Sequence, residues 1–178
     1  RLDGGDGQDI ANLSAATGAI VVNLSLSTAQ TFGAGLGTDT LISIEGVIGG
    51  SYADTITGSD GDDVLFGRGA ADLLNGGDGD DSLEGGAGAD TLTGGLGKDT
   101  ASYSGSGSGV TVNLGTGAAS GGDAAGDTLV TTGNDAIENL TGSAYADSLT
   151  GSAGDNSLEG LAGDDALYGG DGNDMLNG

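Results

Sequence analysis

The sequence has no cysteine, histidine, proline or tryptophan among its 178 residues. These absences exclude a disulfide scaffold, a zinc site built from cysteine or histidine, and the Ser-His-Asp and Cys-His arrangements of nucleophilic catalysis. A collagen helix is excluded as well, because it needs abundant proline and a glycine at every third position. No apolar run approaches the roughly 20 residues that a membrane-spanning helix requires.

Basic and aromatic residues are also scarce. Lysine and arginine total 3 against 27 acidic residues, which gives a net charge of −24. Such a chain is repelled by nucleic acids and by anionic membranes, so we expect neither as a partner. Only 4 of the acids are glutamate, and a bias toward aspartate points to turns and to oxygen ligands for a hard cation. The composition alone also suits a disordered chain, so the periodicity of the sequence has to decide.

What the sequence does contain is glycine, 41 residues in all, and a repeat of nine residues. The repeat has the consensus G-G-x-G-x-D-x-U-x, where U is apolar, as in 76–84, 85–93 and 94–102. Its aspartate recurs at Asp54, Asp63, Asp72, Asp81, Asp90 and Asp99. A second series has Asp147, Asn156, Asp165 and Asp174 in the same position, and an isolated copy ends at Asp9. A flexible linker needs no such register, so we expect an ordered repeat structure.

Each repeat has a physical interpretation. Its glycine-rich six residues form a tight turn whose carbonyls point at a common centre, and its last three form a short strand with one inward side chain. Two repeats make one flattened coil, and successive coils stack as parallel strands about 4.8 Å apart. Asp54, Asp72 and Asp90 then lie along one edge, and Asp63, Asp81 and Asp99 along the other. The inward residues are Ile56, Leu65, Leu74, Leu83, Leu92, Ala101, Leu149, Leu158, Leu167 and Leu176.

A cation between two stacked turns meets two aspartate side chains and several backbone carbonyls. About six oxygen ligands in a flexible cage suit calcium better than magnesium, which tends to keep its waters. The expected side-chain ligands are Asp9, Asp54, Asp63, Asp72, Asp81, Asp90, Asp99, Asp147, Asn156, Asp165 and Asp174. The expected carbonyl ligands are those of Gly58, Asp60, Gly67, Gly69, Gly76, Asp78, Gly85, Ala87, Gly94, Leu96, Gly151, Ala153, Gly160, Ala162, Gly169 and Asp171.

The ion count follows from the pairs on each edge. Partners on neighbouring coils offer the gaps 54/72, 72/90, 63/81, 81/99, 147/165 and 156/174, so we expect about six calcium ions (Ca2+). The 156/174 gap should be the weakest, because Asn156 lacks the charge of an aspartate.

The chain divides into five segments, which form two copies of a unit of roughly 90 residues. We expect residues 1–12 to end a preceding β-roll, 13–48 and 103–141 to be β-strand spacers, and 49–102 and 142–178 to be β-roll arrays. Short alternations of apolar and polar residues predict strands in the spacers. We expect these strands to continue the solenoid as longer coils, and a small separate sandwich is the alternative.

Several spacer features carry expectations of their own. Glu45 and Glu138 are interpreted as solvated acids at strand ends, with additional metal ligands as the alternative. Tyr52 and Tyr145 replace a repeat glycine, and we expect them to pack where each regular array starts. Residues 28–37 and 130–134, where the two copies differ in length, are expected to form exposed loops.

The repeats over 76–102 and spacer sequence such as G-V-T-V-N-L at 109–114 resemble the haemolysin-type RTX (repeat-in-toxin) calcium-binding family. This family of secreted bacterial proteins includes proteases, lipases, alginate epimerases and large adhesins. The resemblance implies an all-β fold, a right-handed parallel β-roll or β-solenoid, which folds with calcium outside the cell after type I secretion. Arg68 and Ala70 depart from the glycine pattern, and we expect weaker or lost sites at turns with such departures.

No unique pair of acids stands out from the repeats, so we expect no enzymatic activity. We interpret the chain as a calcium-folded structural repeat region of a type I-secreted or cell-surface bacterial protein, flanked by further repeats. One alternative is an accessory module of a secreted enzyme such as an epimerase, protease or lipase. The other is an adhesin segment whose partner is a polysaccharide or another extracellular surface.

Overall fold

The computed structural model describes residues 1–33, 35–134 and 136–178. Its regular structure is β throughout apart from one short 3-10 helix, η1 (Gly122–Ala124), which confirms the all-β prediction. The strands up to the middle of the chain are β1 (Leu2–Asp3), β2 (Ile10–Asn12), β3 (Val21–Asn23), β4 (Gln30–Thr31), β5 (Thr38–Asp39), β6 (Leu41–Ile42), β7 (Gly46–Ile48), β8 (Thr55–Thr57), β9 (Val64–Gly69), β10 (Leu73–Asp78) and β11 (Ser82–Ala87). The remaining strands are β12 (Thr91–Leu96), β13 (Thr100–Ser102), β14 (Thr111–Asn113), β15 (Ala118–Ser120), β16 (Thr128–Leu129), β17 (Asn139–Thr141), β18 (Ser148–Thr150), β19 (Ser157–Glu159), β20 (Ala166–Tyr168) and β21 (Met175–Asn177). No helix in this described part of the chain is long and apolar enough to cross a lipid bilayer.

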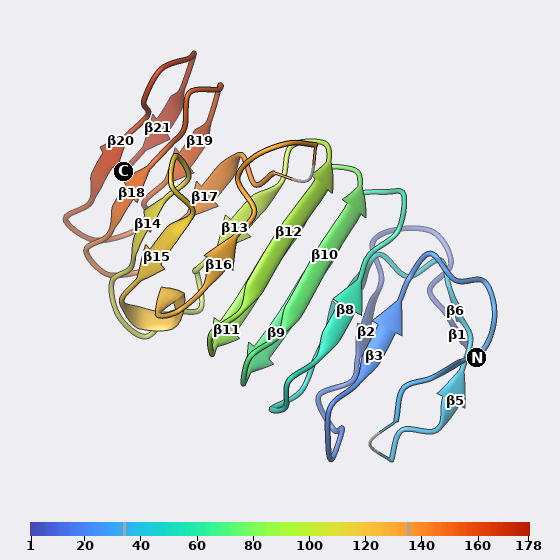
Figure 1. Ribbon diagram of the computed structural model, residues 1–178. Helices are drawn as coiled ribbons and strands as arrows, with labels where there is room; N and C mark the ends of the chain where they lie inside the picture. The colour runs from blue at the N-terminus through green and yellow to red at the C-terminus, as the bar shows by residue number, and fades with distance from the viewer. Residues whose placement is uncertain (34, 135) are drawn as a thin grey trace.

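Most of the strands form two long sheets that run the length of the molecule (Figure 1). The eight-stranded sheet has the order β2-β7-β9-β11-β13-β17-β19-β21, and every pair in it is parallel. The nine-stranded sheet has the order β3-β8-β10-β12-β16-β15-β14-β18-β20. Within the arrays the chain alternates between the two sheets, strand by strand, so the molecule is a parallel β-roll, as predicted.

Successive coils stack in the predicted register. Leu74 lies opposite Ile56 in the coil before it and opposite Leu92 in the coil after it. These three side chains are completely buried. The other inward residues that are at most 1% exposed are Leu65, Leu83, Ala101, Leu149 and Leu158. Leu167 is only partly buried, and Leu176 is 48% exposed, contrary to the prediction. The reason is that β21 is the edge strand of its sheet, so no later coil of this chain covers it.

The spacer strands extend the same two sheets. Strand β16 pairs in parallel with β12, and β17 pairs in parallel with both β13 and β19. Hydrogen-bonded partners across the second spacer are 37 and 39 residues apart, compared with 18 inside the arrays. The added length includes β15, which pairs antiparallel with both β14 and β16. These pairings describe longer coils of one solenoid.

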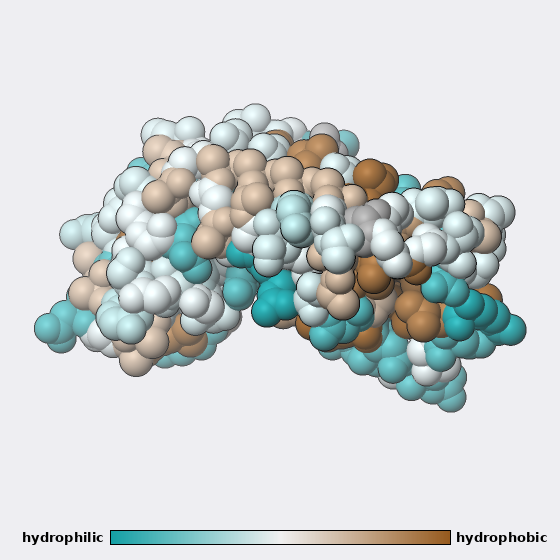
Figure 2. Space-filling model, turned by 90° about the horizontal axis from the view of Figure 1, so that it is seen from below, coloured by the Kyte–Doolittle hydropathy of each residue, from teal (hydrophilic) through white to brown (hydrophobic). Residues whose placement is uncertain are grey.

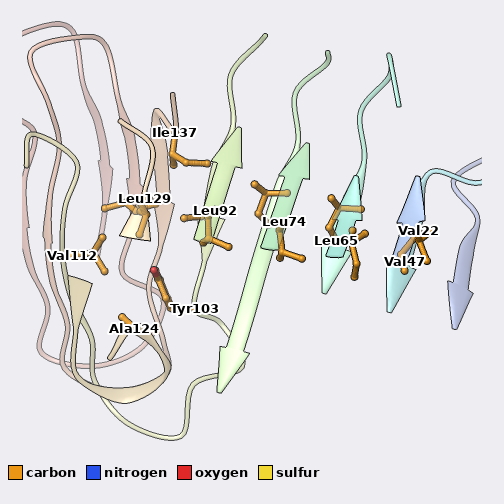
Figure 3. Close-up of a cluster of buried hydrophobic side chains, with 14 of the residues drawn as sticks. Val22, Val47, Leu65, Leu74, Leu92, Tyr103, Val112, Ala124, Leu129 and Ile137 are labelled. Atoms are coloured by element: carbon orange, nitrogen blue, oxygen red, sulfur yellow. The ribbon is translucent and has the colours of Figure 1, made fainter. Parts of the chain in front are cut away.

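Apolar side chains from both sheets, one row from each, fill the space between the sheets (Figure 3). This core is made mainly of leucine, isoleucine and valine, and in the second spacer it includes Tyr103, which is 1% exposed. Phe32 is only 2% exposed and belongs to the same core. The expectation of an exposed loop over 28–37 is therefore wrong at Phe32, because this aromatic side chain packs into the core. Ala34 lies outside the described residues. Residues 132–134 are exposed, as expected.

The outer surface is arched, with a hollow along one side (Figure 2). Tyr52 and Tyr145 lie on this outer surface and are 45% and 51% exposed. They stay outside the buried core, so the expected packing at the start of each array involves only the covered part of each side chain.

Candidate metal centre

The regular turns have a left-handed backbone at their second residue, and most of them also at their fourth. In one such turn Gly77 and Gly79 both have a φ of 119°, which glycine adopts without the steric cost of a Cβ. In the turn before Asp72 the same positions hold Arg68, with φ 81°, and Ala70, with φ 74°. This turn therefore keeps left-handed residues at both positions despite lacking glycine, at a cost of about 1–2 kcal/mol for each such residue.

Backbone amides and aspartate side chains connect successive turns along each edge. The N–H of Asp63 donates to Oδ1 of Asp81 at 2.8 Å, and the N–H of Asp81 donates to Oδ1 of Asp99 at 2.9 Å. The same bond joins Asp54 to Asp72, Asp72 to Asp90, Asp147 to Asp165 and Asn156 to Asp174. These are the six pairs that the sequence places on neighbouring coils, so the structure brings the predicted side-chain ligands together in pairs.

The other carboxylate oxygen often has no partner. Among the described residues, buried side-chain oxygens without a hydrogen bond are Oδ2 of Asp9, Asp72, Asp81, Asp90, Asp99 and Asp165, and Oδ1 of Asp63. Asp72, Asp81, Asp90 and Asp99 are at most 3% exposed. A buried carboxylate oxygen of this kind is costly unless a cation or a proton lies next to it.

Backbone carbonyls of the following coil approach a side-chain oxygen of several RTX turns, and for Asp72 and Asp81 this is the unpartnered oxygen. A Cβ added to Gly76 would overlap Oδ2 of Asp81 and would lie 2.6 Å from the carbonyl oxygen of Gly94. Glycine is therefore needed where the carboxylate oxygen and the carbonyl oxygen come this close to the turn. The predicted carbonyls in this position are those of Gly67, Gly76, Gly85, Gly94, Gly160 and Gly169. No three acidic side chains converge within the described residues, so carboxylates and carbonyls together form the oxygen set, which suits calcium.

Burial makes these carboxylates hard to ionise in the absence of a metal ion. Burial raises the pKa of Asp72 and of Asp81 from 3.8 to about 7, and the hydrogen bond from the preceding coil offsets only part of this. Burial likewise raises the pKa of Asp99 to about 6. Neighbouring ladder aspartates raise the pKa of Asp72 and of Asp81 further by charge repulsion, and Glu138 and Asp80 do the same for Asp99. A divalent cation in the row would relieve both the burial cost and the repulsion.

A family model for the RTX calcium-binding nonapeptide repeat matches the chain in four copies, at residues 47–74, 66–101, 131–165 and 141–176. Together the four copies cover more than half of the chain. The chain belongs to the RTX calcium-binding nonapeptide repeat family. No curated protein matches it. The chain is therefore a calcium-binding repeat region, and the paired RTX aspartates are its candidate metal ligands.

The RTX turns of this chain are of two kinds. In the open kind, as at Gly77, the second residue is left-handed, and in the closed kind it is not. Closed turns begin both arrays, and their second residues are Gly50, Ser59, Ser143 and Ser152. There the second amide donates to a side-chain oxygen of the turn's own aspartate or asparagine, as from Ser59 to Oδ2 of Asp63 at 2.5 Å. A closed turn therefore satisfies part of its side chain without a metal ion.

Asn156 is hydrogen-bonded at both ends of its side chain. Its Oδ1 accepts the N–H of Ser152 at 2.6 Å, and its Nδ2 donates to the carbonyl of Glu138 at 2.6 Å. Among the predicted carbonyls, that of Leu96 accepts the N–H of Gly79 at 2.7 Å. Both groups are already engaged by the protein, as are both carboxylate oxygens of Asp54 and of Asp147.

Glu45 and Glu138 are not solvated strand-end acids, so that interpretation is wrong. Oε2 of Glu45 accepts the N–H of Asp9 at 3.0 Å, and Oε2 of Glu138 accepts the N–H of Asp99 at 2.9 Å. Both glutamates are partly buried. Burial raises the pKa of Glu138. Each glutamate replaces the RTX aspartate at the coil where a spacer returns to the eight-stranded sheet.

Asp127 has a similar place in the row along the other edge of the roll. The nonapeptide pattern did not predict it as a ligand. Its Oδ1 accepts the N–H of Asp90 at 2.9 Å, which continues the ladder of Asp54, Asp72 and Asp90 into the spacer. Asp127 is 6% exposed. One sequence feature could have identified Asp127. Residues 127–129 repeat the Asp-Thr-Leu of residues 39–41, and neither copy lies in an RTX turn.

Proposed function

We propose that this chain is a calcium-folded, non-enzymatic structural region of a bacterial protein that type I secretion exports to the medium or to the cell surface. RTX repeat proteins are generally secreted, which supports this location. The observation that carries the proposal is the row of buried carboxylate oxygens without partners along both edges of the roll. A roll that is built in this way is stable only where calcium is abundant, and that is outside the cell.

Electrostatics explains why calcium would drive folding. The net charge is −24, and folding stacks aspartates of neighbouring coils against one another. About six calcium ions would supply about +12 and would be held only by the folded chain, so their binding free energy becomes folding free energy. Without calcium, few large apolar residues oppose the repulsion, and we expect a disordered chain.

The structure also supports the expected distribution of ions. Each of the gaps 54/72, 72/90, 63/81, 81/99 and 147/165 contains at least one aspartate with a buried, unpartnered oxygen. The remaining gap, 156/174, contains none in the described chain, and Asn156 is already hydrogen-bonded at both ends. We therefore expect 156/174 to bind calcium most weakly.

Circular dichroism of the calcium-stripped chain tests the proposal. We expect a disordered spectrum in chelator and a β-rich spectrum after millimolar calcium, with magnesium at the same concentration as the control. Calorimetry should then count about six ions per chain. A β-rich spectrum that calcium removal leaves unchanged, or a count of one or two ions, would contradict the proposal.

The outer face of the eight-stranded sheet favours surface binding as a second candidate function. A groove of about 280 Å³ is lined there by Asn12, Ile48, Phe66, Arg68 and Glu84. An apolar ring beside amide, guanidinium and carboxylate groups is suited to a sugar, and the net charge of −24 favours an uncharged polysaccharide over an acidic one. Retention on a column of a neutral polysaccharide, lost in Phe66→Ala and kept in Phe32→Leu, would support this candidate.

An accessory role beside a catalytic domain is the other alternative for the region. The sequence that flanks the region in its parent gene distinguishes this role from an adhesin, because a catalytic domain carries its own conserved active-site residues. A calcium-folded roll serves either parent in the same way, as a rigid spacer that forms only after export.

A further inference from the structure

The eight-stranded sheet carries an acidic ladder that does not stop where the RTX repeats stop. Each of its strands is preceded by an acid or an amide, and in chain order these residues are Asp9, Glu45, Asp63, Asp81, Asp99, Glu138, Asn156 and Asp174. At two of the junctions between an RTX turn and a spacer turn, the amide of the RTX aspartate donates to the glutamate of the next coil. They are Asp9 with Glu45 and Asp99 with Glu138.

The Asp99–Glu138 junction has the same connections as a pair inside an array. Strands β13 and β17 run in parallel with Thr100 opposite Asn139. The N–H of Asp99 donates to Oε2 of Glu138 at 2.9 Å, just as the N–H of Asp81 donates to Oδ1 of Asp99 at 2.9 Å. The carboxylate of Glu138 therefore meets the preceding coil in the way that an RTX aspartate does.

The junction also brings an unpartnered carboxylate oxygen close to a spacer carbonyl. Asp99 is completely buried, and its Oδ2 has no hydrogen-bond partner. A Cβ added to Gly94 would overlap both this Oδ2 and the carbonyl oxygen of Ala136. The free oxygen of Asp99 thus lies next to a spacer carbonyl, in the arrangement that Asp81 has with Gly94 inside the array.

A similar arrangement, with a partly buried aspartate, occurs near the start of the chain. The N–H of Asp9 donates to Oε2 of Glu45 at 3.0 Å, and Oδ2 of Asp9 is buried without a partner. A Cβ added to Gly4 would overlap the carbonyl oxygen of Ser43. Both junctions thus contain an aspartate amide that donates to a glutamate of the next coil. Because this bond occurs twice, it is a recurring feature of the fold.

From these observations we infer two further calcium sites, one between Asp99 and Glu138 and one between Asp9 and Glu45. Each combines an RTX aspartate with a spacer glutamate and a spacer carbonyl, outside the pairs of nonapeptides. The inference rests on the proposed calcium-dependent folding of the arrays. The two sites would fix each spacer coil to its array, so calcium would order the spacers as well as the repeats.

The two junctions differ in one neighbouring charge. Residue 98, directly before Asp99, is lysine, which carries a positive charge. The corresponding residue before Asp9 is Gln8, which is uncharged. A positive charge close to a calcium site repels the ion, so we expect the Asp99–Glu138 site to be the weaker of the two. Lys98→Gln should then bring its affinity toward that of the Asp9–Glu45 site.

Native mass spectrometry of the full chain in calcium, combined with calorimetry, tests the inference. Glu138→Gln and Glu45→Gln should each bind one ion fewer than the wild type, and the double variant two fewer. Glu159→Gln makes the same change of charge on a strand of the same sheet, outside the ladder, and should leave the count unchanged. Unchanged counts in the first two variants would overturn the inference.

A crystal structure of the wild-type chain grown in calcium keeps the test independent of variant folding. Anomalous peaks bordered by Oδ2 of Asp99 and the carbonyl of Ala136, and by Asp9 and Glu45, would support the junction sites. Peaks confined to the arrays would overturn them and leave the proposed function intact. A chain that folds without binding any calcium would overturn both.

Discussion

The hydroxyl of Tyr103 donates a hydrogen bond of 3.1 Å to Oδ2 of Asp127, inside the core of the second spacer. Oδ1 of the same carboxylate accepts the N–H of Asp90. Both oxygens of Asp127 are thus satisfied by the protein, in contrast to Asp72 and Asp90, which precede it in the row and each keep one unpartnered oxygen. A tyrosine hydroxyl therefore takes the place that a cation would otherwise hold next to Asp127, and it separates the 72/90 pair from the 147/165 pair on this edge.

Removing this hydroxyl should destabilise the roll even when calcium is present. Tyr103→Phe leaves a carboxylate oxygen buried without a partner, which costs about 1–3 kcal/mol of unfolding free energy. Urea unfolding in saturating calcium measures the loss. Tyr145→Phe is the matched control, because Tyr145 is 51% exposed, and its effect should be close to zero. Equal stabilities for the two variants would show that the bond to Asp127 contributes nothing.

An interior aspartate should matter more than a terminal one. Asp81 bonds to the coil before it through Oδ1 and to the coil after it through its N–H, so Asp81→Ala weakens two gaps. Asp174 lies in the last coil and belongs to one gap only. Because the stability of a solenoid is roughly a sum over neighbouring coils, the calcium midpoint for folding should rise more in Asp81→Ala than in Asp174→Ala. Calcium titrations followed by circular dichroism compare the two variants, and equal shifts would rule out shared ligands along an edge.

Acid should partly replace calcium in folding the chain. The folded, metal-free roll raises the pKa of Asp72 and Asp81 from 3.8 to about 7, chiefly through burial. A raised pKa in the folded state contributes stability below the unfolded pKa, and that contribution is lost as the pH rises through about 7. The calcium-stripped chain should therefore gain β structure as the pH falls from 8 to 4.5.

Asp81→Asn is the matched variant for this experiment, because an amide resembles the protonated acid. Its calcium-stripped form should depend less on pH than the wild type does. Circular dichroism of both chains from pH 8 to 4.5 measures the effect. A wild-type chain that stays equally disordered over this range would contradict the burial of these carboxylates.

The left-handed residues in the turn before Asp72 offer a test of backbone strain. Ala70 has a φ of 74°, so Ala70→Gly should stabilise the roll by about 1 kcal/mol in calcium. Ala71→Gly is the control, because Ala71 does not have a positive φ. Glycine at this position relieves no strain and only increases the conformational entropy of the unfolded chain. The control should lower stability by about 0.5 kcal/mol. Urea unfolding that shows a loss in both variants would contradict the strain at Ala70.

The period of nine residues was enough to predict the coil, its inward row and the pairing of aspartates along two edges. A residue such as Leu74 is in register with every neighbouring leucine of its row, so local sequence and stacking give the same answer. The calcium chemistry followed for the same reason, because glycine, aspartate and their spacing recur together. None of this required a contact between distant segments that the repeat does not itself generate.

Only the tertiary structure decided the roles of residues outside the repeat. Phe32, Asp127 and Glu138 have no nonapeptide around them, and their partners lie up to 39 residues away along the chain. Whether an acid at a strand end is solvated or joins the ladder depends on which coil stacks beside it, and spacers of irregular length conceal that register from the sequence. The hydrogen bond of Tyr103 to Asp127 and the open or closed state of each turn depend in the same way on packing between coils, which a single repeat does not determine.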